Sequence, residues 1–142
     1  MKKITILSIL FFVVNACTKN IELTPVTQIT PVNIDVTKPA ESTGTFSNGV
    51  HVVSGTVKVV VDKMDATKKY LSFENFKTDM GPDLYIYLAE DKNATGALSV
   101  TKLDKTGTFT LDIPANANLT KQKYVLVWCK QFSVHFGSAK LE

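Results

Sequence analysis

The sequence lacks arginine altogether, and its chemically active side chains are few. It has two cysteines, two histidines and one tryptophan in 142 residues, and all 16 basic side chains are lysines. The formal net charge is only +3, and Lys2 and Lys3 at the start of the chain supply most of that excess. Nucleic-acid-binding domains usually carry a larger excess of Lys and Arg gathered on one face. The composition therefore argues against a nucleic-acid partner.

Common catalytic motifs are missing as well. There is no Gly-rich phosphate loop, no Gly-x-Ser-x-Gly, no His-Glu-x-x-His and no Cys-x-x-Cys, so the Cys-x-x-Cys-His motif that attaches c-type haem is also missing. Two histidines are too few for a dedicated multi-histidine metal site. We therefore expect no such metal centre, and a noncatalytic domain is favoured over an enzyme.

The first 16 residues have the layout of a signal peptide. Lys2 and Lys3 precede the apolar stretch 4–14, which spans about 16 Å as a helix, too short for a bilayer core of about 30 Å. The following Val14-Asn15-Ala16-Cys17 resembles the lipobox of bacterial lipoproteins, in which the cysteine becomes the lipid-bearing N-terminus. The alternative is an ordinary cleavage site with an incidental Cys17. The first interpretation predicts an exported lipoprotein anchored through Cys17 to a membrane of the bacterial envelope, expected to be the outer membrane.

Residues 17–43 have the composition of an extended tether. They hold three of the five prolines, many threonines and no glycine. Such a chain favours extended conformations that reach about 3.1 Å per residue. Val32, Ile34 and Val36 alternate with polar residues, a pattern that is also compatible with an added edge strand.

Residues 44–142 alternate between apolar and polar side chains, which predicts β-strands. Residues 53–61 show this pattern clearly, whereas residues 84–89 are apolar on both faces and predict a central strand. Turn signals such as Gly81-Pro82-Asp83 separate the strands, and no amphipathic helix is found. The pattern predicts an all-β domain of about seven to eight short strands, arranged as an antiparallel β-sandwich or a barrel.

The candidate functional residues lie near the C-terminus. The only tryptophan, Trp128, adjoins Cys129, and Phe132 and Phe136 follow. A thiol can exchange electrons, pair with another thiol or ligate iron, and neighbouring rings would shield a bound group from water. The simpler interpretation is that Cys129 is a small buried hydrophobic residue beside a core tryptophan. Both interpretations stay open at this point.

The other thiol and the two histidines bear on the same question. If Cys17 carries lipid, Cys129 is unpaired in a compartment where thiols normally form disulfides; otherwise the two cysteines can pair. His51 has the parity of the inward-facing Val53, so it is expected to point inward if no bulge intervenes. His135 is expected to face solvent. Either histidine could serve as a second ligand, although a lone histidine on a strand is more often structural or exposed.

Several segments of the domain together resemble a known family. They are Gly44-Thr45-Phe46 with Ser54-Gly55-Thr56-Val57, Leu71-Ser72-Phe73-Glu74-Asn75-Phe76, Gly81-Pro82-Asp83-Leu84-Tyr85-Ile86-Tyr87-Leu88, and Val127-Trp128-Cys129-Lys130-Gln131-Phe132-Ser133-Val134-His135-Phe136-Gly137-Ser138-Ala139. In this order they resemble the DM-thirteen domain, an exported β domain of bacterial lipoproteins that also occurs in Skeletor-like animal proteins. The resemblance spans residues 44–142.

The resemblance implies an electron-transfer role, with the near-invariant cysteine of the family at Cys129. The thiol would act bare or as the ligand of a prosthetic group such as haem. The DOMON and cytochrome b modules that accompany the domain in animals are not found in this sequence, so a redox partner would be a separate protein.

Two functions follow from these observations. The first is a membrane-tethered, extracytoplasmic electron-transfer module that presents Cys129 to a redox partner. The rival is a noncatalytic binding or structural module of the envelope, whose loops contact a glycan, a protein or another envelope component. In the rival function Cys129 only fills the core.

Overall fold

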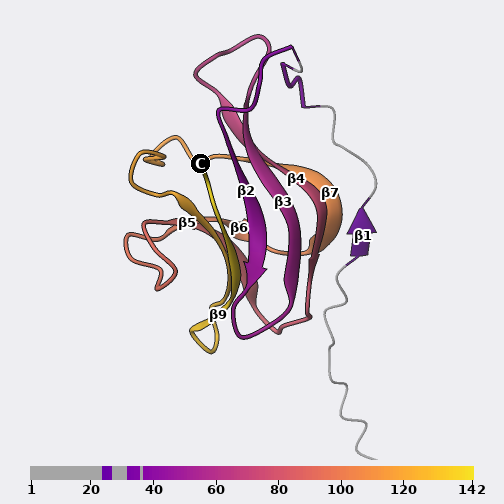
Figure 1. The fold of residues 1–142 in the computed structure, drawn as a ribbon, viewed down its shortest axis with the longest axis vertical. Helices are drawn as coiled ribbons and strands as arrows, with labels where there is room; N and C mark the ends of the chain where they lie inside the picture. The colour runs from indigo at the N-terminus through magenta and orange to yellow at the C-terminus, as the bar shows by residue number, and fades with distance from the viewer. Residues whose placement is uncertain (1–23, 27–31, 36) are drawn as a thin grey trace, which may run out of the picture.

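A computed structural model describes residues 24–26, 32–35 and 37–142, and its regular elements are all β-strands (Figure 1). None of the described residues forms a helix long and apolar enough to cross a membrane. In chain order the strands are β1 (Thr24–Val26), β2 (Ser42–Asn48), β3 (Val53–Val61), β4 (Lys69–Thr78), β5 (Leu84–Ala89), β6 (Leu98–Lys102), β7 (Lys105–Asp112), β8 (Tyr124–Cys129) and β9 (Val134–Lys140).

The strands form one sheet in the order β1-β7-β4-β3-β2-β9-β8-β5-β6. The first half of β2 pairs with β3 and its second half with β9, so β2 joins the two walls that Figure 1 shows on the right and left. The sheet curls until β6 and β7 come close, and a narrow seam lined by Val100, Thr101, Thr110 and Leu111 remains between them. The predicted all-β fold is confirmed, as a nearly closed barrel-like sheet.

A ninth, short strand comes from the segment expected to be a tether. β1 pairs in parallel with residues 105–107 of β7, whereas the other neighbouring strands are antiparallel. Of the alternating residues noted in this segment, Ile34 makes a single antiparallel bridge with Asp62, and Val36 lies outside the described residues.

An aromatic cluster fills one part of the barrel. The ring of Phe73 stacks on that of Phe109 with the two centroids 4.6 Å apart. The ring centroids of Phe46 and Phe76 lie 5.9 and 5.4 Å from the centroid of Phe73. Phe73 and Phe76 both point inward although they are three residues apart, because β4 carries an extra residue against both of its neighbours. Asn75, at a φ of 51°, adopts the left-handed conformation that this bulge requires.

A polar contact lies where β3 ends and β4 begins. The hydroxyl of Tyr70 donates a hydrogen bond of 2.7 Å to Oδ2 of Asp62, and the backbone amides of Met64 and Asp65 donate to Oδ1 at 2.8 and 3.1 Å. These bonds, led by that of Tyr70, lower the pKa of the Asp62 carboxyl from its ordinary value. The ionised carboxylate therefore stabilises the turn between the two strands.

This contact predicts a loss of stability in acid. Because the folded-state pKa of Asp62 is lowered, its contribution is present above the unfolded pKa of 3.8 and is lost as the pH falls through the folded value. We expect the free energy of unfolding, measured with urea between about pH 7 and pH 2, to decrease in that window. Tyr70→Phe should flatten the dependence, because it removes the strongest donor. Parallel curves for the two proteins would show that the pair is unimportant.

Candidate functional site

Cys129 is the last residue of β8, and its side chain belongs to the hydrophobic core. It pairs with Leu84 at the start of β5 and with Val134 at the start of β9. The residue is 1% exposed and is the one free cysteine of the described part of the chain. Cys17 lies outside the described residues, so its lipidation stays a prediction.

Phe136, His51 and the loop at Gly81 close the barrel end at which Cys129 lies. Phe136 is 3% exposed, and the imidazole of His51 stacks on its ring with the centroids 3.8 Å apart. A Cβ atom on Gly81 would lie 2.9 Å from the Phe136 ring and 2.7 Å from the Leu84 side chain. The loop therefore packs directly on these two residues, and a larger side chain at Gly81 would require them to shift.

His51 differs from the inward position expected for it. It precedes β3, and its side chain is 38% exposed. Its Nδ1 lies 3.4 Å from Oδ2 of Asp79, which follows β4. The sequence did not predict this pair. Its two residues are brought together by the register of the β3–β4 hairpin, in which Val53 and Thr78 are partners.

His135 lies on the outer face of the barrel, away from the thiol. It pairs with Trp128, which alternates along β8 with the inward-facing Cys129, and the two ring centroids are 6.3 Å apart. The expectation that His135 faces solvent is not met. The residue is half-buried, and its Nε2 is buried without a hydrogen-bond partner in the described part of the chain. The turn after β2 covers it, since a Cβ on Gly49 would lie 2.8 Å from its Nδ1.

The three aromatic residues expected to surround Cys129 have different positions. Phe136 shares the core with the thiol. Trp128 is half-buried on the outer face, where it pairs with Tyr85 of β5. Phe132 is 63% exposed, because residues 130–133 form the turn between β8 and β9 instead of the start of the last strand. Of these three residues, only Phe136 is therefore positioned to shield the thiol within the barrel.

A protein-family model described as Electron transfer DM13 matches residues 45–141. The match runs from β2 to the end of β9 and includes Cys129. The chain belongs to this family. No curated protein and no solved structure matches the chain.

Haem does not fit around Cys129 of this DM13 domain. The thiol is enclosed among core side chains, and His135 points to the other face of the sheet. The imidazole of His51 is engaged with Phe136 and Asp79. Within the described ranges, His, Cys, Asp and Glu side chains form no group of three that could hold a metal ion. A macrocycle at the thiol would have to displace well-packed core residues.

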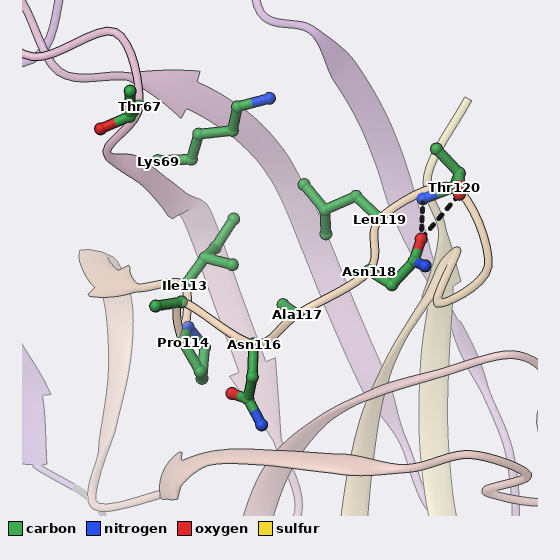
Figure 2. Close-up of a pocket in the computed structure, with 10 residues that line it drawn as sticks. Thr67, Lys69, Ile113, Pro114, Asn116, Ala117, Asn118, Leu119 and Thr120 are labelled. Carbon is green, nitrogen blue, oxygen red and sulfur yellow. Dashed lines mark hydrogen bonds between the residues drawn. The ribbon is translucent and has the colours of Figure 1, made fainter.

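A pocket of about 550 Å³ lies at the opposite end of the DM13 barrel, beside residues 113–120 (Figure 2). The side-chain oxygen of Asn118 accepts hydrogen bonds from the amide and the hydroxyl of Thr120 at 3.1 and 2.6 Å, as the dashed lines in Figure 2 show. These bonds hold the loop in shape. No thiol or histidine lines this pocket, so it is separate from the site at Cys129.

Proposed function

We propose that this DM13 chain is a membrane-tethered, extracytoplasmic and noncatalytic electron-transfer module with Cys129 as its redox centre. The family match over residues 45–141 supports the proposal, because it attaches an electron-transfer description to a barrel with one described cysteine. The tether, the signal peptide of residues 1–16 and the lipid on Cys17 are part of the proposal and rest on sequence alone. They place the domain at an envelope membrane, where a separate protein supplies or accepts the electron.

The burial of Cys129 restricts the chemistry of this module. A thiol that is 1% exposed cannot meet a bulky reagent directly, so we propose transfer across a docked interface. Loss of one electron and the thiol proton would leave a thiyl radical, with the electron reducing the partner's acceptor and the proton released to water. The reverse step, which takes up one electron and one proton, would restore the thiol. Trp128 is the residue next to Cys129 on β8, and its side chain lies on the outer face of the barrel. We therefore place the docked partner over the row of Tyr85, Trp128 and His135, which are paired across three strands.

The same burial supports a second candidate function. Free cysteines in proteins are most often small buried hydrophobic residues, and Cys129 is part of the core cluster. In this function the barrel is a noncatalytic binding or structural module of the envelope. In that case the domain would give no reversible redox response.

Spectroscopy and voltammetry of a fragment of residues 18–142 test the proposal. The fragment keeps the whole core, which lies within residues 46–141. We expect no Soret band before or after reduction, slow reaction with a bulky thiol probe until denaturant is added, and a reversible redox response on an electrode. A protein silent on the electrode would contradict electron transfer and favour the binding module. A Soret band that shifts on reduction would show instead that the core opens to admit haem.

A further inference from the structure

A groove of about 430 Å³ lies on the outer face of the barrel, on the other side of the sheet from the thiol. It crosses β2, β9 and β8 and also contacts the turn between β5 and β6. Its lining combines ammonium groups, one carboxylate and several hydroxyl groups, contributed by Lys92, Lys140, Glu142, Thr43, Thr45, Ser47, Tyr124 and Ser138.

Ser138 supplies an unused donor at the floor of this groove. Along β9 it alternates with the inward-facing Ala139, and it pairs with Ser47 on one side and Leu126 on the other. The residue is 2% exposed, and its hydroxyl has no hydrogen-bond partner among the residues that the structure describes. The hydroxyl of Ser47 donates to the backbone oxygen of Ser138 at 3.2 Å, so it does not satisfy that hydroxyl. A buried hydroxyl without a partner costs free energy. A ligand that accepts a hydrogen bond from this hydroxyl would remove that cost.

The lysines of the groove come from separate elements. Lys140 pairs with Glu142, whose carboxylate is also close to the ammonium of Lys123. Lys92 takes part in none of the ion pairs among the described residues. Its turn is held in place, because Nε2 of Gln122 donates to the backbone oxygen of Gly96 at 2.7 Å. Of the two ammonium groups in the lining, that of Lys140 is paired with Glu142, and that of Lys92 has no ion-pair partner among the described residues.

We propose that this groove binds a phosphate-type oxyanion. Lysines bind phosphate as point charges, and hydroxyls donate to the several oxygens of a tetrahedral anion. The groove is larger than a phosphate ion, so it accommodates an attached group as well. A phospholipid headgroup and a soluble phosphomonoester share this chemistry. The inference goes beyond electron transfer and does not depend on Cys129.

His135 provides an internal reporter of occupancy. Burial lowers the pKa of its imidazole most, and the Lys92 ammonium lowers it further, while a backbone hydrogen bond with Gly137 raises it. His135 and Ser138 lie on the same outer face of β9. An anion bound by Lys92 would offset the repulsion between the ammonium and the imidazolium. The pKa of His135 should therefore rise when the groove is filled.

Titration of inorganic phosphate into the fragment of residues 18–142, followed by nuclear magnetic resonance, tests the proposal. We expect saturable shifts at the amides of Thr45 and Ser138 and an increase in the pKa of His135. Lys92→Gln should weaken binding about tenfold, the effect of losing one charged hydrogen bond. Lys77→Gln is the matched control, because Lys77 is an exposed lysine on β4, outside the groove. Absence of saturable shifts, or equal effects of the two variants, would overturn the proposal.

A second arm separates the two sources of the anion. Vesicles of phosphatidylglycerol, with phosphatidylcholine vesicles as the reference, are added to the same fragment and sedimented. Retention on phosphatidylglycerol that Lys92→Gln removes would identify a headgroup site. Phosphate binding without retention would identify a soluble phosphoryl ligand. The electrode response of Lys92→Gln should equal that of the unmodified protein, so failure of the anion site and failure of electron transfer are told apart.

Discussion

The variant Cys129→Ala is expected to lose the redox response of the barrel and to keep its fold. Cys129 is the one cysteine of the described chain and the proposed redox centre, so its removal should remove the response. Removing its buried sulfur leaves a small cavity and should cost roughly 1–2 kcal/mol. Domains of this size are commonly stable by about 5–15 kcal/mol, so the variant should stay folded. Voltammetry measures the response, and urea unfolding measures the stability.

Cys129→Ser is the matched variant, because it changes polarity with little change in shape. A serine hydroxyl among the apolar neighbours of Cys129 would lack a partner, at a cost of roughly 1–3 kcal/mol. We expect it to be redox-silent, like the alanine variant, and no more stable than it. An undiminished electrode response in both variants would exclude Cys129 as the redox centre and show that another group of the domain carries the electron.

The alternation of side chains was enough to predict much of the barrel. The stretch expected to be a central strand is β5, which lies between β8 and β6 with Leu84, Ile86 and Leu88 buried. The alternation of side chains predicts this strand correctly because its backbone is regular and the core covers its inner face. The choice between barrel and sandwich could not be made, because strand order depends on pairings between residues far apart in the chain.

Irregular backbone limits what the alternation of side chains can predict. Period two would place Phe76 on the face opposite Phe73, and only the bulge at Asn75 turns it inward. Strand parity likewise fails at His51, because β3 begins after it at Val53. Asparagine tolerates a positive φ, yet most asparagines are not in bulges, so sequence alone gives no clear signal.

The sequence predicted which residue is the candidate centre, but it did not predict the surroundings of that residue. The sequence indicated Cys129 and left its exposure open, since a strand end can be buried or exposed. Its burial follows from pairing with Leu84 and Val134 on both sides. The oxyanion groove gave no signal in the sequence, because its lysines and hydroxyls come from four segments that only the sheet register brings together.

Phe73→Ala is expected to cause the largest loss of stability of any single substitution considered for this barrel. Its ring is fully buried and contacts the rings of Phe46, Phe76 and Phe109, with centroids 4.6 to 5.9 Å away. Truncating a buried phenylalanine typically costs about 3–5 kcal/mol, through lost burial and the cavity left behind. That is a large share of the total, so the midpoint of urea unfolding should drop steeply.

Phe132→Ala is the matched control for this loss. It removes the same atoms from the turn between β8 and β9, where the ring is 63% exposed, and surface changes of this kind usually stay within about 0.5 kcal/mol. If both variants unfolded at similar urea concentrations, the aromatic cluster could not be the main support of the barrel. The expected difference would show that much of the stability of the domain comes from the interior cluster on β2, β4 and β7. The thiol could then be changed for functional tests without removing that support.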